Sequence, residues 1–479
     1  MRWKDRKSSM KNPVFYLQYS YMIILNLFFR FLSKLSEKLR NAILWISVFA
    51  LIGNYFIRES VFTLKYKFTF STTQWTILCT FLLLIIILFS IKEPLKILKI
   101  NAKNKVFVLF YFITPILIII SSFDHKIGNG VRPFALAMLI VFPCLYFVWS
   151  NRGDYHTLFN MISWALVVFG TILLIVNVAY FFWHIEDFDI SAYSYIRYVG
   201  IFTNPNIFGL TTVAIFTGAF YLLYTAQRNI KAFLIIIMIL YFMMVLLSGS
   251  RTSLLAIVAQ IIVLLIFVYK SKHDKKKYLK KKTKKIILVC ASIVIIIPIV
   301  LSILSMSNVI SYNDNSLIKI PLSIQRLLPN NNLTINELSS GRIAFWLEYL
   351  KEITLIGKDP NKHHVIVDGL EVYGAHNTTI EVAYRSGILA GISITILLFS
   401  TLPFLLRGVK RSRERCKSLL FSCMAIIAYF PPFIIEVPFS PFHSFSSYIL
   451  CFYIAIGPLM FKKEDVPLNA TEQADLPQL

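Results

Sequence analysis

Long apolar runs recur along most of this 479-residue chain and constrain its fold more than any other feature. Each run holds about 17 to 25 residues, which lets one helix cross the ~30 Å hydrocarbon core of a bilayer. The runs lack the alternation of apolar and polar residues that is typical of membrane β-barrels. Because lipid offers no partner to an unpaired backbone group, the runs must be helices. The sequence therefore predicts an all-α polytopic membrane protein.

We expect about twelve transmembrane helices, at 42–58, 74–91, 106–122, 131–149, 158–183, 205–224, 230–248, 252–270, 286–305, 379–402, 419–436 and 444–461. They divide the chain into an amino-terminal segment over 1–41, nine helices over 42–305, one large polar loop over 306–378, three helices over 379–461 and a tail over 462–479. The apolar stretch 13–29 is either a further span or a helix lying in the membrane interface. Basic residues on both sides of it favour the interface.

The distribution of Lys and Arg predicts which connections are cytoplasmic. One alternate set of loops, together with both termini, carries 35 of the 49 basic residues, whereas the opposite set carries 14 of the 24 acidic residues. By the positive-inside rule the basic set is cytoplasmic, so both termini are cytoplasmic and the 306–378 loop is external. The lysine-rich run 270–285 then anchors this topology against anionic membrane lipids, and we expect no nucleic-acid partner.

Three groups of polar residues lie at the ends of spans or in the long loop on the external side. Arg197, Asn204 and Asn206 precede or begin the span at 205–224, where Asn204-Pro205 is a helix-start signal. Arg251 follows Leu247-Ser248-Gly249-Ser250 in a connection of only a few residues. An arginine there either reaches lipid headgroups or points into the bundle, where its planar fork suits phosphate oxygens.

The third group of polar residues lies in the large loop, which carries Arg342 and ends in His376-Asn377 directly before the next apolar run. An imidazole can accept a proton from a hydroxyl at neutral pH, so His376 is a candidate general base. Asn377 is a candidate helix cap, and capping alone would leave His376 without a role. His363 and His364, in the middle of the loop, are weaker candidates.

Arginines that bind a diphosphate, beside a histidine that deprotonates a hydroxyl, would suit glycosyl transfer from a polyprenyl diphosphate. We expect no cofactor, because the chain has neither a nucleotide-phosphate loop nor a Rossmann fingerprint. The cysteines show no metal spacing. The acidic run Glu186-Asp187-Phe188-Asp189 has the form of a metal–phosphate clamp, a pattern that is common by chance.

The order of these motifs resembles that of the O-antigen ligase and polymerase superfamily. The shared motifs are N-P-N before a span, S-G-S-R-T opening another, G-R-x-x-x-W in a long external loop and H-N-x-x-I-E-x-x-x-x-x-G-I-x-x-G after it. The similarity is strongest over about 195–260 and 335–395, and the first 150 residues match only as hydrophobic helices.

The resemblance implies a type C glycosyltransferase-like fold in the bacterial inner membrane, with its active site facing the periplasm. It implies transfer of O-antigen from undecaprenyl diphosphate to lipid A-core, without a metal, in lipopolysaccharide biosynthesis. Arg251 and Arg342 match the arginines proposed to hold the diphosphate, and His376 matches the proposed base. Arg197 occupies the position of a further arginine. The metal independence of the ligases argues against Asp187 and Asp189 as metal ligands.

Three functions remain open from the sequence. A ligase and a polymerase take the same donor, and they differ in whether the acceptor hydroxyl belongs to lipid A-core or to a second lipid-linked glycan. The single prominent loop late in the chain favours the ligase. A lipid-linked oligosaccharide flippase or transporter is the third possibility. It is disfavoured because most spans are nearly uncharged and no inverted repeat is apparent.

Overall fold

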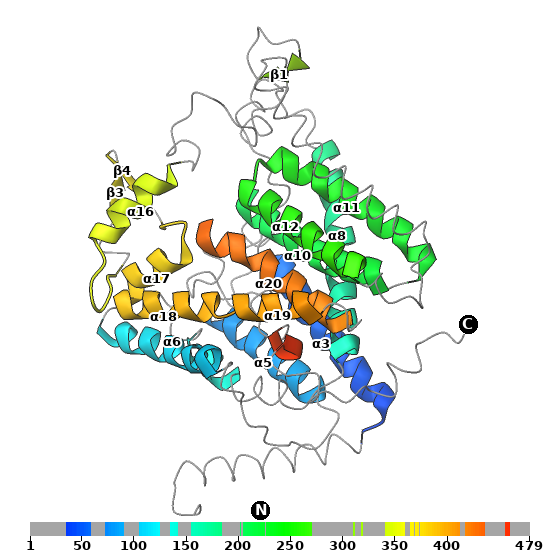
Figure 1. Ribbon diagram of the computed structural model, residues 1–479, viewed down its shortest axis with the longest axis horizontal. Coiled ribbons are helices and arrows are strands. Elements are labelled where there is room, and N and C mark those ends of the chain that lie inside the picture. The colour runs from blue at the N-terminus through cyan, green and yellow to red at the C-terminus, as the bar shows by residue number, and fades with distance from the viewer. Residues whose placement is uncertain are drawn as a thin grey trace, which may run out of the picture.

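The computed structural model describes residues 35–58, 72–90, 105–124, 135–141, 155–183, 202, 205–225, 227–270, 310–311, 318–319, 341–359, 365–367, 369–372, 374–411, 417–435 and 456–459. Within these ranges the chain is mostly helical (Figure 1). Six helices there are long and apolar enough to cross a membrane: Tyr155–Ala179, Pro205–Thr225, Asn229–Ser248, Arg251–Tyr269, Ile388–Arg411 and Lys417–Ile434. The prediction of an all-α, multi-pass membrane protein agrees with this architecture.

The long helices are α3 (Glu37–Arg58), α5 (Thr72–Ser90), α6 (Lys105–Asp124), α8 (Tyr155–Trp183), α10 (Pro205–Thr225), α11 (Arg228–Ser248), α12 (Arg251–Lys270) and α20 (Lys417–Ile435). Each begins and ends within a few residues of an expected span. Of the other expected spans, 286–305 lies outside the described residues, and only 135–141 and 456–459 are described of 131–149 and 444–461. The apolar stretch 13–29 also lies outside them.

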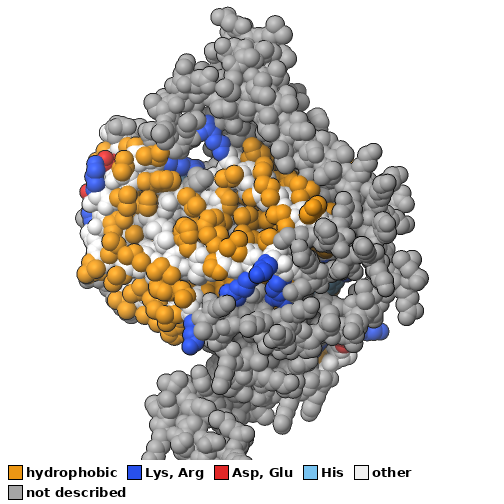
Figure 2. Space-filling view, viewed as in Figure 1, with side chains coloured by type: hydrophobic (Ala, Val, Ile, Leu, Met, Phe, Trp, Pro, Cys, Tyr) orange, Lys and Arg blue, Asp and Glu red, His pale blue; other side chains and the backbone are white. Residues whose placement is uncertain are grey.

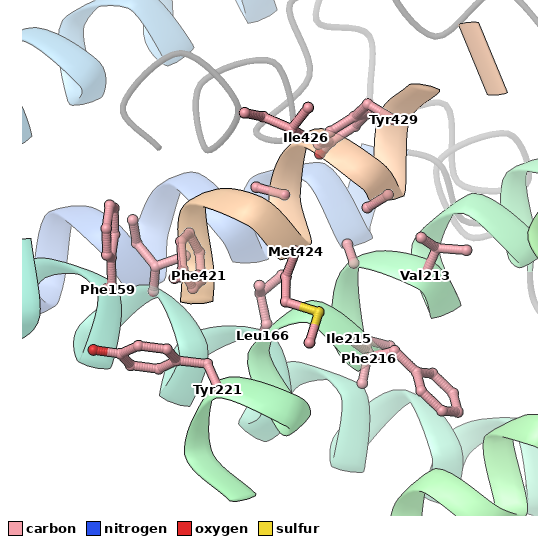
Figure 3. Packing of buried hydrophobic residues seen from close by; sticks show 14 of the residues in the cluster. Phe159, Leu166, Val213, Ile215, Phe216, Tyr221, Phe421, Met424, Ile426 and Tyr429 are labelled. Carbon is pink, nitrogen blue, oxygen red and sulfur yellow. The ribbon is translucent and has the colours of Figure 1, made fainter. Parts of the chain in front are cut away.

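The centre of the bundle is formed where α8, α10 and α20 pack together (Figure 3). Phe421 of α20 stacks on Phe159 of α8, with ring centroids 4.3 Å apart, and meets Tyr221 of α10 edge-on at 5.4 Å. Phe159 and Phe421 lie near the amino-terminal ends of their helices, whereas Tyr221 lies near the carboxyl-terminal end of α10. Helix α10 therefore runs antiparallel to both α8 and α20.

Helices α10 and α12 run parallel, because contacts between them advance along both helices together. A Cβ atom on Gly209 of α10 would lie 2.1 Å from the Ser253 hydroxyl of α12. Two turns further along, Nε2 of Gln260 donates a hydrogen bond to the Thr217 hydroxyl at 2.6 Å. Small and hydrogen-bonded residues of this kind let helices approach closely in lipid, where no hydrophobic force drives them together.

The expected span at 379–402 is not one helix, and this part of the prediction is wrong. Gly387, with φ +90° and ψ 158°, separates α17 (Thr378–Ser386) from α18 (Ile388–Phe399), which continues toward α19 (Leu402–Arg411). The Thr379 and Thr395 hydroxyls lie 2.8 Å apart, so α17 folds back along α18 as a tight hairpin. The amphipathic α17, which carries Glu381 and Arg385, gives way at Gly387 to the wholly apolar α18, and the expected span overlooked this change.

The described part of the large loop contains α16 (Arg342–Lys351) and a hairpin of strands β3 (Val365–Val367) and β4 (Leu370–Val372). The strands pair antiparallel, with Ile366 opposite Glu371. A further pair, β1 (Ile310–Ser311) and β2 (Ile318–Lys319), is parallel. A small apolar cluster, separate from the main core, joins α16 to β3 and α17; it contains Tyr349, Val365, Val367, Ala375, Ile380 and Tyr384.

Candidate active site

One end of the helix bundle collects most of the expected site residues that the structure describes. Because α10 and α12 are parallel and α20 is antiparallel to α10, the amino termini of α10 and α12 lie at the same end as the carboxyl terminus of α20. We call this end, marked by Asn206, Arg251 and Ile434, the polar end of the bundle. Figure 1 shows α17 close to the end of α20 on this side.

Arg251 and Asn206 lie in the first turns of α12 and α10 at the polar end. Both side chains are half-buried. Gly209, one turn after Asn206, abuts Ser250 and Ser253 on either side of Arg251. The hydroxyls of these two serines lie 2.8 Å apart, and both residues are buried. Tight contact between the two helix starts thus brings together two motifs that lie about 45 residues apart in the sequence.

Asn377 connects the His376 segment to the polar end. Its Oδ1 atom accepts a hydrogen bond from the Ile380 backbone N–H at 3.0 Å, which caps α17 as the sequence predicts. Its Nδ2 atom donates to the backbone carbonyl of Ile434, at the end of α20, at 2.8 Å. A single side chain therefore starts the helix and docks it on the bundle.

His376 has φ +48°, and it is the only non-glycine residue with positive φ in the described part of the chain. The left-handed conformation costs an L-residue roughly 1–2 kcal/mol, so surrounding contacts must hold it. On its amino-terminal side, the Gly374 N–H donates to the Tyr349 hydroxyl at 2.9 Å, and the Ala375 N–H donates to Oε2 of Glu381 at 2.6 Å. On its carboxyl-terminal side, Asn377 is fixed as described above.

Glu381 is almost fully buried, and a cation compensates its charge. Its Oε1 atom lies 2.5 Å from Nε of Arg385, one turn later on α17, as an ion pair. The other carboxylate oxygen is left to hold the backbone of the His376 segment. Losing one partner of such a buried pair is costly, because the remaining charge is desolvated.

Arg342 begins α16, which packs beside the His376 segment. The Phe345 ring, one turn after Arg342, lies 6.5 Å from the His376 imidazole between ring centroids. Both His376 and Arg342 are half-buried. The structure thus places Arg342 one helical turn from the ring that contacts the candidate base.

Tyr349 is the aromatic centre of this arrangement. Its ring meets that of Tyr384 edge-on, with centroids 4.9 Å apart. Burial, followed by the nearby Glu381 carboxylate, raises the pKa of Tyr349 to about 12. The phenol therefore stays neutral across the physiological range, and its oxygen remains an acceptor for the Gly374 N–H.

No model of a known protein family matches this sequence, and a search of curated proteins finds none similar to it. The site must therefore be judged on its own residues. Two expected members, Arg197 and Asn204, lie outside the described residues, as do the run Glu186–Asp189 and the histidines His363 and His364.

The sequence reasoning missed the roles of Glu381 and Tyr349. Glu381 stands five residues after His376, within the H-N-x-x-I-E motif. The available signal was a glutamate within an expected membrane span, because such a residue is seldom buried without a specific partner. Tyr349 offered no comparable signal, since its contact with Gly374 spans 25 residues.

The polar end carries Arg251 at a helix start, and Asn377 docks there the His376 segment, which has a fixed backbone and lies beside the α16 helix that Arg342 begins. A helix amino terminus favours an anion, and guanidinium groups bind phosphate oxygens in pairs.

Proposed function

We propose that this protein is a membrane-embedded glycosyltransferase, an O-antigen ligase. It would transfer a polysaccharide from undecaprenyl diphosphate to a hydroxyl of lipid A-core at the periplasmic face of the inner membrane. The observation that carries the proposal is the Asn377–Ile434 hydrogen bond, which docks the His376 segment at the end of the bundle where Arg251 and Asn206 lie. The motif order quoted above supports the choice of substrate.

In this proposal His376 takes the proton of the acceptor hydroxyl as its oxygen attacks the anomeric carbon of the donor sugar. The bond between that carbon and the phosphate oxygen breaks, and undecaprenyl diphosphate leaves with the electron pair. Arg251 and Arg342 stabilise the leaving diphosphate, and Arg197 would assist them. Direct displacement inverts the anomeric carbon. No step requires a metal or another cofactor.

The test is a lipopolysaccharide gel from a strain lacking the gene, complemented with wild type, His376→Ala or Arg342→Ala. We expect core bands without O-chains in the deletion strain and polymer accumulating on the lipid carrier. His376→Ala should lose about 10²- to 10⁴-fold of the transfer rate, the contribution of a general base. His364→Ala, in the same loop, is the matched control and should restore the ladder.

Other gel patterns would indicate a different function or overturn the proposed site. Core carrying a single repeat unit in the deletion strain would indicate a polymerase, for which the same residues serve a lipid-linked acceptor. An unchanged ladder would overturn a role in O-antigen transfer. Normal transfer by both His376→Ala and Arg342→Ala, at wild-type protein levels in the membrane, would overturn the site.

A further inference from the structure

Four large apolar side chains stand exposed on the segment that follows Arg342. Leu347 and Leu350 lie on α16 and are 56% and 51% exposed, and Leu355 and Ile356, in the loop after α16, are 67% and 46% exposed. The opposite face of α16 is occupied, because Tyr349 is buried in the small apolar cluster with β3 and α17. The exposed leucines therefore face away from the protein interior.

This exposed apolar surface continues directly onto a candidate membrane span. The Ile388 N–H, at the start of α18, donates to the Thr354 carbonyl at 3.0 Å. A Cβ atom on Gly387 would lie 2.1 Å from the Leu355 carbonyl oxygen, so the two backbones touch. In Figure 1 the loop after α16 descends to this end of α18.

The first two turns of α18 also carry outward-facing apolar side chains. Ile388, Leu389 and Ile392 are 42%, 52% and 49% exposed. Side chains of this kind on a span face lipid, and Figure 2 shows hydrophobic side chains spread over one side of the molecule. Leu355 and Ile356 thus extend the exposed apolar surface of a candidate span, which a bilayer would cover.

The length of the span sets the depth of the loop. Ile388–Arg411 has 24 residues and is about 36 Å long at 1.5 Å per residue. The hydrocarbon core is only ~30 Å thick, so the first turn of α18 lies near the interface. Leu355 and Ile356, against that turn, would then lie at the level where headgroups meet acyl chains.

The charged residues around the apolar side chains fit this depth. Lys351 is paired with Glu348 at 2.6 Å, and Lys358 is paired with Glu352. Pairing lowers the cost of placing carboxylates near lipid, and lysine side chains reach outward to headgroups from a partly buried stem.

We propose that α16 and the loop over 352–359 dock on the membrane, with Leu347, Leu350, Leu355 and Ile356 inserted at the headgroup–acyl boundary of phospholipids. The loop also binds α17, because the Lys358 N–H donates to the Tyr384 carbonyl at 2.8 Å. Membrane docking therefore fixes the depth of the His376 segment, whether or not a substrate is bound.

The test is photocrosslinking of the full-length protein in native membranes, with p-benzoylphenylalanine in place of Leu355. After irradiation, mass spectrometry of the tryptic peptide should show a phospholipid adduct at Leu355. Glu371, exposed on β4 and away from α18, is the matched control and should give at least tenfold less adduct. Substitution of an exposed side chain leaves the buried cluster intact, so loss of folding does not obscure the result.

Two outcomes would overturn the proposal. One is a crosslink from Leu355 to another protein, which would make this surface a protein interface. The other is a lipid adduct at Leu355 no stronger than that at Glu371, which would place the loop in water. Neither outcome depends on glycosyl transfer, so the result stands apart from the test of the proposed function.

Discussion

Asn377 and Ile434 join two helices through a single hydrogen bond of 2.8 Å between a side-chain amide and a backbone carbonyl. The carbonyl belongs to the last turn of α20, where backbone acceptors have no partner within the helix. Asn377 supplies that partner while its other atom, Oδ1, caps α17. The position next to the candidate base thus has two structural functions, and substitutions can separate them.

Replacing Asn377 with Asp should keep the cap and remove the docking. A carboxylate still accepts from the Ile380 N–H, because Asp and Asn are comparable caps. It cannot donate to Ile434, and it sets an anion against a carbonyl oxygen. We expect transfer to fall about 10²-fold through misplacement of His376, while far-UV circular dichroism of the purified protein is unchanged. Wild-type transfer by Asn377→Asp would show that only capping matters.

Replacing Glu381 with Gln should loosen the His376 segment. The amide oxygen can still accept from the Ala375 N–H, but the charge-assisted bond and the ion pair with Arg385 are lost. We expect the free energy of unfolding to fall by at least about 1–2 kcal/mol, the difference between charged and neutral hydrogen bonds, because Arg385 also loses its partner. Thermal melting of the purified protein in detergent measures this loss of stability. Glu371→Gln, an exposed change on β4, should melt like wild type, and equal melting of both variants would contradict the role of Glu381.

Replacing Gly387 with Ala tests the tight hairpin between α17 and α18. The backbone at Gly387 lies in a region open almost only to glycine, and its added Cβ would strike the Leu355 carbonyl oxygen. Gly369 also has positive φ, +80°, but nothing lies within 4 Å of its Cβ position. Gly387→Ala should therefore lower the free energy of unfolding by roughly 1–3 kcal/mol more than Gly369→Ala does. We expect its melting temperature to be several degrees lower. Indistinguishable melting would mean that the hairpin is absent in the membrane.

Alkaline titration should reveal the buried phenol of Tyr349. Its folded pKa of about 12 lies above the ordinary value near 10. The contribution of the neutral phenol to stability is therefore complete below pH 10 and is lost as the pH rises through 12. The tyrosinate absorbance of wild type minus that of Tyr349→Phe should rise near pH 12. A difference curve centred near pH 10 would place Tyr349 in water.

The sequence by itself determined that the chain is a helical membrane protein and where most of the long helices begin and end. Apolar length decides this locally, because a bilayer requires each span to satisfy its own backbone. The residues of the candidate site could also be predicted from the sequence. Arg251, Arg342 and His376 stand where apolar runs begin or in the one long polar loop.

Only the tertiary structure decided how those residues meet. The turn at Gly387 depends on contact with Leu355, and the fixed backbone at His376 depends on Tyr349 and Glu381. None of these contacts produces a periodic pattern in the sequence. The approach of Asn206 to Arg251 likewise depends on Gly209 packing against Ser253. Hydropathy reports the exchange of a side chain between water and lipid, whereas these relationships arise from the fit between particular atoms of separate helices.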